Sequence, residues 1–199
     1  LHRDRVEERR IHPVVHEGEP EVQVGRAIAA HRRHDAGEVA APDVGGARTD
    51  VLERPAMPSP VAAKRLLVAV TRVAERLVAV GPRGHIVVST DAGESWQQAQ
   101  VPVSSDLTAV HFPSDKLGWA VGHDGVVLAT NDGGMTWSKQ LDGRAVNELI
   151  LADVKAKLAA NPESIELQAL VAEAERAREQ GPDKPFLDVW FENDTHGYV

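Results

Sequence analysis

The sequence predicts an all-β fold, and three observations predict it. From Leu66 onward, short apolar runs alternate with turns rich in Gly, Pro, Asn and Asp, as strands and hairpins require. Two segments share landmark residues at one constant offset, and each contains the pattern Ser/Thr-x-Asp-x-Gly-x-Ser/Thr-Trp. A repeat of about 40 residues with three or four short strands is typical of β-propeller blades. We therefore expect a propeller fragment with two blades and the start of a third.

Residues 1–48 form the first segment, which we expect to be poorly ordered or an unreliable part of the coding sequence. All eight aromatic residues of the chain lie from Trp96 onward, and residues 1–48 offer only scattered aliphatic side chains. Such a segment buries too little apolar surface to offset the entropy lost on ordering. Its pairs His12 with His16 and His31 with His34 have helical metal-ligand spacing. We expect no metal there, because a convincing third ligand is absent.

A proline-marked linker at residues 49–65 is predicted to lead into two blades at residues 66–142. In each blade the predicted strands are short apolar runs, and a Gly-containing turn joins two of them. The first blade has strands at Leu66–Val70, Leu77–Gly81 and His85–Ser89; the second has them at Leu107–Phe112, Gly118–Gly122 and Val126–Thr130. The landmarks that repeat are Gly81 and Gly122, Gly84 and Gly125, Asp91 and Asp132, Gly93 and Gly134, and Trp96 and Trp137.

Residues 143–184 change to a helical period and are predicted to form an inserted helical hairpin. One apolar stripe holds Val146, Leu149, Ile150 and Val154, and the other holds Leu167, Leu170, Val171 and Ala174. Asn161 is expected to cap the second helix, with Pro162 at its first position, and Gly181-Pro182 is expected to end it. The hairpin is either a solvated protrusion or a docking element for a partner.

A third copy of the repeat is predicted at residues 185–199, truncated after its first strands. Val189, Phe191 and Gly197 correspond to Val110, Phe112 and Gly118 in the second copy. Because the chain begins with Leu1 and ends at Val199 inside a strand-like run, we expect it to be a piece of a longer protein.

The repeated motif is predicted to be structural. An Asp carboxylate in such a turn can accept backbone N–H groups, the Gly supplies a positive φ, and the Trp buries a large ring. A catalytic group is needed once, whereas this motif occurs in both copies. The structural residues are Ser89, Asp91, Gly93 and Trp96 in the first copy, and Thr130, Asp132, Gly134 and Trp137 in the second.

Composition excludes several classes of function. The net charge of −8 and the absence of basic clusters beside aromatic residues argue against a nucleic-acid partner. The chain has no Cys, no apolar run long enough to span a membrane and no readable signal peptide. No nucleophile elbow, phosphate loop or His-Glu metal motif occurs, and His85, His111 and His123 are expected in loops or at strand edges. We assign no catalytic, cofactor or metal site.

The segments AVGPRGHIVVSTDAGESW and AVGHDGVVLATNDGGMTW, with the intervening LTAVHFPSDKLGWAVG, resemble the Asp-box (BNR-repeat) β-propellers. Within that group they resemble the photosystem II stability/assembly factor-like family, which also occurs in non-photosynthetic bacteria. The resemblance implies a non-catalytic binding or scaffold protein that assists a membrane-protein complex. It also implies a protein partner and a periplasmic or exported location.

A sialidase-like glycoside hydrolase fragment is the alternative, because such enzymes share Asp boxes. That chemistry uses a Tyr nucleophile and needs arginines aimed at the substrate carboxylate. Tyr198 is the single tyrosine, and it aligns with the packing residue Trp119. Arg83 lies in a predicted hairpin turn, and successive blades lack a set of three arginines. We therefore expect the chain not to be an enzyme.

Overall fold

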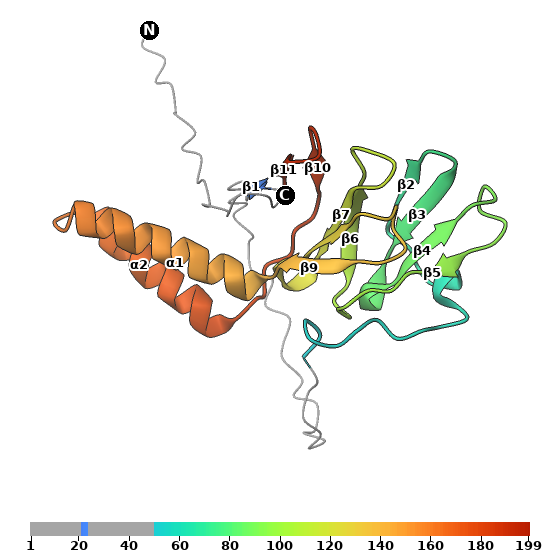
Figure 1. Ribbon diagram of the computed structural model, residues 1–199. Coiled ribbons are helices and arrows are strands. Elements are labelled where there is room, and N and C mark those ends of the chain that lie inside the picture. Colours follow the sequence, from blue (N-terminus) through green and yellow to red (C-terminus); the bar gives the residue numbers. More distant parts are fainter. Residues whose placement is uncertain (1–20, 24–49) are drawn as a thin grey trace, which may run out of the picture.

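The computed structural model describes residues 21–23 and 50–199, so the expectation for residues 1–48 concerns residues that lie almost entirely outside the described part. The four histidines of the candidate metal pairs lie outside it as well. The described residues form three β-sheets and a hairpin of two α-helices (Figure 1). The sheets follow one another along the molecule, and the helices project from it on the side away from the first four-stranded sheet.

The first four-stranded sheet is antiparallel, with its strands in sequence order. They are β2 (Ala69–Val73), β3 (Arg76–Val80), β4 (Ile86–Ser89) and β5 (Gln97–Gln98). Its first strand is shifted from the prediction, because Leu66–Val70 was expected and Ala69–Val73 pairs with β3. The shift follows from the two-residue turn Ala74–Glu75, which fixes the register from the other end of the strand.

The second four-stranded sheet repeats this order. Its strands are β6 (Leu107–His111), β7 (Gly118–Gly122), β8 (Val127–Thr130) and β9 (Ser138–Leu141). The turns η2 (Pro82–Gly84) and η3 (His123–Gly125) occupy the same place in the two sheets. In each, the second and third residues have positive φ, between 59° and 70°, as a tight hairpin of this hand requires.

The third sheet contains β10 (Trp190–Phe191), β11 (His196–Tyr198) and β1 (Glu21–Gln23). Trp190 lies opposite Tyr198, just as His111 lies opposite Trp119 in the second sheet, which is the register that the third repeat predicts. The strand β1 pairs with β11 in parallel, whereas the other strand pairs of the described residues are antiparallel.

Two apolar layers join the three sheets. The layer between the first and second sheets contains Val78, Val80, Ile86, Leu128 and Trp137. The layer between the second and third sheets contains Trp119, Val121, Val127, Val189 and Phe191. Each sheet therefore buries apolar side chains against its neighbour, which is how an antiparallel sheet gains most of its stability.

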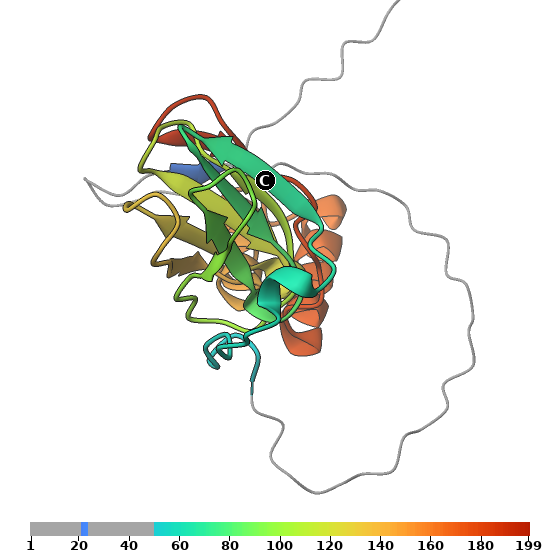
Figure 2. The same ribbon diagram turned by 90° about the vertical axis from the view of Figure 1, so that its right-hand side faces the viewer.

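Residues 50–65, most of the segment expected to be a linker, lie against the two large sheets. Leu52 is almost fully buried in the first apolar layer, and Ala56 N donates a hydrogen bond to Val101 O at 3.0 Å. The short helix η1 (Ala62–Lys64) covers Ala79 and Val87 on the outer side of the first sheet, as Figure 2 shows in the view from that end. The segment is thus part of the folded unit.

The inserted hairpin consists of α1 (Gly143–Ala160) and α2 (Ile165–Gln180). The prediction that Asn161 caps α2 is wrong: Ser164 caps it, since its Oγ accepts from Leu167 N at 3.2 Å. Asn161 instead follows the end of α1, and the turn between the helices contains Pro162.

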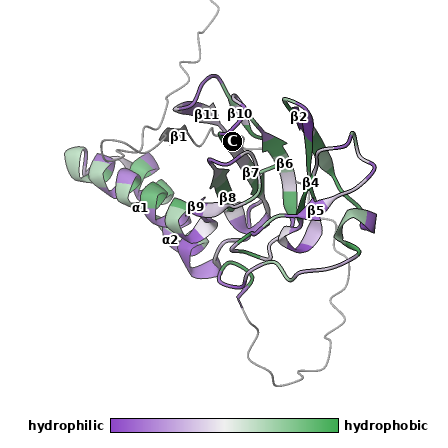
Figure 3. Ribbon diagram, turned by 45° about the vertical axis from the view of Figure 1, so that its right-hand side comes forward, coloured by the Kyte–Doolittle hydropathy of each residue, from purple (hydrophilic) through white to green (hydrophobic). Residues whose placement is uncertain are grey.

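The side of α1 that packs on α2 differs in part from the predicted stripe. Val154 of that stripe is buried against α2, as are the predicted α2 residues Leu170, Val171 and Ala174 in whole or in part. Leu151 joins them, whereas Leu149 is 47% exposed and Ile150 is 37% exposed. A helical period does not by itself say which of two overlapping stripes meets the partner helix. Figure 3 accordingly shows hydrophobic and hydrophilic residues mixed along both helices.

Candidate functional site: the Asp-box turns and the base of the helical hairpin

The first Asp-box turn joins β4 to β5 and is closed by its own side chains. Ser89 Oγ donates to Asp91 Oδ1 at 2.8 Å and accepts from Gly93 N at 2.8 Å. Asp91 also accepts from the backbone N and the hydroxyl of Ser95. Trp96 Nε1 donates to Gly93 O at 3.0 Å, so all the predicted residues of this motif take part in the turn.

The second Asp-box turn, between β8 and β9, repeats these contacts one for one. Thr130 Oγ1 donates to Asp132 Oδ1 at 2.8 Å and accepts from Gly134 N at 3.1 Å. Thr136 donates to Asp132 through both its N and its hydroxyl, and Trp137 Nε1 donates to Gly134 O at 2.9 Å. The two turns are therefore the same local structure made by different sequences.

Both Asp carboxyl groups are strongly acidic. Hydrogen bonds from Ser95 and Ser89 lower the pKa of Asp91 to about 2. Burial acts to raise the pKa of Asp132, but hydrogen bonds from Thr136, Thr130 and Met135 outweigh it and lower the pKa to about 2. A general acid must still carry its proton near neutral pH, and a general base needs a pKa closer to neutral pH than about 2. These carboxylates therefore suit turn closure and not proton transfer.

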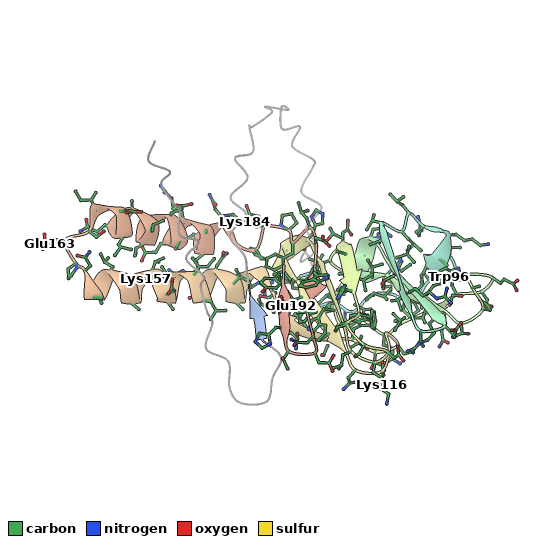
Figure 4. The ribbon with its side chains drawn as sticks, turned by 90° about the horizontal axis from the view of Figure 1, so that it is seen from above. Trp96, Lys116, Lys157, Glu163, Lys184 and Glu192 are labelled. Atoms are coloured by element: carbon green, nitrogen blue, oxygen red, sulfur yellow. The ribbon has the colours of Figure 1, made fainter. Side chains whose placement is uncertain are left out.

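The surroundings of the two turns differ. The ring of Trp137 meets Phe112 edge-on with centroids 5.9 Å apart, and Trp137 belongs to the layer between the first two sheets. Arg76 of β3 reaches the second turn from the first sheet, since its Nη1 donates to Asp132 O at 3.5 Å. Its Nη2 donates to Asp115 O, in the loop between β6 and β7, at 2.6 Å. Trp96 has only the small cluster around η1 beside it and remains half-buried, at the end of the molecule labelled in Figure 4.

The other residues weighed from the sequence are not brought together. Tyr198 stacks on Trp190 with centroids 6.1 Å apart, and Arg83 is exposed in η2 with its backbone N donating to Asp106. His111 Nε2 lies 3.2 Å from Phe191 O, and His85 is buried. Among residues 21–23 and 50–199, no group of three His, Cys, Asp or Glu side chains is arranged to hold a metal ion. This arrangement does not assemble the tyrosine and arginines that a sialidase site requires.

A cluster of charges at the base of the helical hairpin was not predicted. Lys139 Nζ donates to Asp142 Oδ2 at 3.0 Å, to Glu53 Oε1 at 2.9 Å and to Leu52 O at 3.0 Å. Asp142 also caps α1 by accepting from Arg144 N and Ala145 N, and Arg144 pairs with Asp50. The Asp142-Gly143 step before the helical period was the signal that could have located this cap.

The charges of this cluster reinforce one another. Burial acts to lower the pKa of Lys139, but its bonds to Glu53 and Asp142 raise it. Burial acts to raise the pKa of Asp142, but Lys139 and the backbone donors lower it. Residues 50–53 are thereby fixed to β9 and the start of α1, which follow each other directly in the chain but lie far from residues 50–53 in sequence. This cluster sets where the hairpin leaves the sheet.

The repeated four-stranded sheets and their two identical turns define an Asp-box repeat protein. The family described as photosynthesis system II assembly factor YCF48 matches residues 36–129 and 88–159, and the chain belongs to this family. A 45-residue segment is 47% identical to the photosystem II stability/assembly factor HCF136, chloroplastic, of Guillardia theta. That segment covers 22% of this chain and 11% of the relative. No solved structure gives a significant match.

Proposed function

We propose that this chain is part of a β-propeller that serves as a non-catalytic binding protein in the assembly or stability of a membrane-protein complex. Its membership of the photosynthesis system II assembly factor family carries the proposal. The turns support the binding role, because Asp91 and Asp132 each use their carboxylates within their own turn. In a photosynthetic cell the complex would be photosystem II, which the name of the relative specifies.

The propeller itself is part of the proposal. The strands β2 and β6 begin the two large sheets, and they lie side by side. In a propeller the first strand of each blade lines the central channel, and each blade packs face to face on the next. The two apolar layers between the three sheets have this arrangement. Further blades would be needed to close the ring.

The helical hairpin is the proposed docking element. It is inserted between β9 and β10, and the charge cluster around Lys139 holds its base in a fixed direction. Its exposed apolar residues include Leu149, Ile150 and Ile165, the last at the start of α2 near the tip marked by Glu163 in Figure 4. We take these exposed apolar side chains as the surface through which the hairpin would contact the partner.

A periplasmic, lumenal or otherwise exported location is proposed from the family alone. Among the described residues, the helices are too short or too polar to cross a bilayer. The partner's membrane part would then be reached from the water-exposed side by the surface of this chain.

A binding assay with photosystem II tests the function. Tagged chain would be incubated with detergent-solubilised photosystem II assembly intermediates and, separately, with mature photosystem II, and the retained core subunits would be quantified. We expect the intermediates to be retained and the mature complex to be retained less. Equal background retention of both would contradict the proposal.

The hairpin's part is tested with matched variants. Leu149→Glu and Ile165→Glu place a charge on exposed positions of the hairpin, whereas Met57→Glu does so on the segment beside the sheets. We expect the two hairpin variants to lose retention and the Met57 variant to keep it. Retention that is unchanged in both hairpin variants would show that the hairpin is not the docking element.

A further inference from the structure

An open groove lies between the first and second sheets, at the end of the sheets from which the hairpin projects. Its volume is about 240 Å³, and its lining residues include Leu66, Val68, Pro82, Asp106, Leu107 and His123. The hairpin begins beside it, because α1 follows β9 directly and packs against η3, which contains His123 (Figure 1). In the proposed propeller, the blades that close the ring pack before the first sheet and after the third, so they leave this groove open.

One wall of the groove is apolar, exposed and fixed in place. Leu66 is 77% exposed and Val68 is 53% exposed, although Val68 N donates a hydrogen bond to Val80 O at 2.9 Å. An added Cβ at Gly81 would lie 2.8 Å from Leu66 O, so the backbone of this segment lies directly on the end of β3. Aliphatic side chains on a backbone that is already ordered lose little freedom when a partner covers them.

The other wall carries the carboxylate of Asp106, whose position is fixed from two sides. Its Oδ1 accepts a hydrogen bond from Arg83 N at 2.7 Å, and its backbone O accepts one from His123 N at 2.8 Å. Its Oδ2 accepts no hydrogen bond within the described part of the chain, and none of the ion pairs found there includes Asp106. Because Asp106 is exposed, this oxygen can accept a donor from another molecule.

The repeat does not require an acidic residue at this place. The connections that lead into the second and third sheets make equivalent backbone hydrogen bonds, from Leu107 N to Gly81 O at 3.1 Å and from Phe186 N to Gly122 O at 3.0 Å. Pro185 therefore occupies the place of Asp106 in the second of these connections. The carboxylates that hold the Asp-box turns together recur in both copies, whereas this one does not. This difference favours recognition over fold maintenance as the role of Asp106.

The size and charge of the groove indicate what it can hold. Pockets for small molecules usually have volumes of about 300–1,000 Å³, and this groove is smaller. It therefore suits a few side chains of a protein segment. The net charge of −8 attracts a basic partner from a distance, and an Arg or Lys side chain matches the open oxygen of Asp106. An aliphatic side chain matches the exposed wall of Leu66 and Val68.

We propose that this groove binds an extended protein segment in which an aliphatic residue lies next to an Arg or Lys. The aliphatic side chain covers Leu66 and Val68, and the cationic group bonds to Oδ2 of Asp106. The proposal deepens the proposed function and rests on it, because the segment would belong to the same partner that the hairpin contacts. The groove would then fix how that partner lies relative to the hairpin.

Peptide binding to the 199-residue chain, followed by nuclear magnetic resonance, tests the groove without photosystem II. The probe is the peptide Gly-Ser-Leu-Arg-Leu-Arg-Ser-Gly, and its matched controls replace both Arg by Glu or both Leu by Ala. We expect the Leu-Arg peptide to shift the amide resonances of Val68 and His123. Both control peptides should bind at least about tenfold more weakly, since each lacks one of the two complementary groups.

Variants with matched controls locate the contact. Asp106→Asn should weaken binding of the Leu-Arg peptide about threefold, as expected for an exposed ion pair, and still accept the bond from Arg83 N. Val68→Ser should weaken it about fivefold, because apolar contact is lost. Asp115→Asn and Met57→Ser change an exposed acidic and an exposed apolar residue outside the groove and should leave binding unchanged. The amide spectrum of each variant verifies that it folds.

Several results would overturn the proposal. These are equal binding of the Leu-Glu peptide, resonance shifts confined to the hairpin, unchanged binding by either groove variant, and equal weakening in the two control variants. The outcome is separate from that of the retention assay. Retention of photosystem II intermediates without peptide binding would reject the groove alone, and peptide binding without retention would reject the proposed function alone.

Discussion

The indole of Trp119 stacks on the ring of Phe191, with an interplanar angle of 11°. These two residues join β7 to β10 across the helical hairpin, which separates them in the sequence. Phe191 also covers Gly197, where an added Cβ would lie 2.5 Å from its ring. The third sheet has only short strands, so we expect this aromatic contact to be its main anchor.

Phe191→Ala should therefore release the third sheet. The loss of a buried aromatic ring is expected to cost about 3–5 kcal/mol of the local opening free energy. Hydrogen exchange at the amides of β10 and β11 would measure it, since exchange there should become much faster while that of β3 and β4 changes little. Leu187→Ala, at an exposed position nearby, is the control. Unchanged protection of β11 in the Phe191 variant would contradict the assignment of Phe191 as the anchor.

The two motif tryptophans should differ in their contribution to stability. Trp137 is buried between two sheets, so Trp137→Ala is expected to lower the free energy of unfolding by about 3–5 kcal/mol. Trp96→Ala should cost clearly less, because its ring is half-buried beside η1. Chemical denaturation of both variants measures the difference. Equal losses would mean that the neighbouring sheet does not determine the burial of this position.

The two motif glycines offer a parallel comparison. Gly93 and Gly134 have φ values of 97° and 99°, so an Ala side chain is strained at both. At Gly134 a Cβ would also meet Val78 Cγ2 at 3.3 Å and Phe112 Cζ at 3.4 Å, whereas at Gly93 its closest neighbour would lie 3.7 Å away. Gly134→Ala should therefore lower the melting temperature more than Gly93→Ala. The reverse order would contradict the packing of the second turn against the first sheet.

The turn carboxylates should make stability depend on acid. The pKa of Asp132 is about 2 in the folded chain, whereas the ordinary value for an Asp carboxyl is 3.8. The carboxylate therefore contributes its full stabilisation above pH 3.8, and this contribution is lost as the pH falls toward 2. Asp132→Asn should destabilise the protein at neutral pH by roughly 1–2 kcal/mol, since charged hydrogen bonds become neutral ones. The difference in free energy of unfolding between variant and wild type, measured by urea denaturation, should become smaller as pH falls from 4 to about 2. A gap that is constant with pH would show that the carboxylate charge is not responsible.

The repeated parts of this chain could be predicted from the sequence, because the same pattern of strand and turn residues occurs in two copies that support each other. The equivalence of Trp96 and Trp137 located both turns, and the offset of Phe191 and Gly197 located the third sheet. The burial of Trp137 could not be predicted from its own motif, since it depends on a neighbouring sheet. The side of α1 that faces α2 could not be predicted either. Leu149 and Leu151 both fit a helical period, and only packing on α2 selects Leu151.

The cluster of charges at the base of the hairpin also could not be predicted from the sequence, because it joins residues that are far apart in the chain. Glu53 and Lys139 are ordinary charged residues in their own segments, and nothing local marks them as partners. Asp142 alone had a local signal, as a helix cap. Long-range polar contacts of this kind depend on the completed fold.

Lys139→Met should loosen the hairpin without unfolding the sheets. The substitution keeps an apolar stem but removes the donor that Asp142, Glu53 and Leu52 O share. Asp142 still caps α1, so the helix should remain, and far-ultraviolet circular dichroism should change little.

A pair of spin labels, one at Glu163 on the hairpin tip and one at Lys116 beside the sheets, would report the orientation of the hairpin relative to the sheets. Both side chains lie at the surface (Figure 4). We expect a broader distance distribution in the Lys139 variant than in the wild type, and Lys157→Met, in an ion pair within α1, should leave it unchanged. An unchanged distribution in the Lys139 variant would show that the helix and the sheets are held together by other contacts.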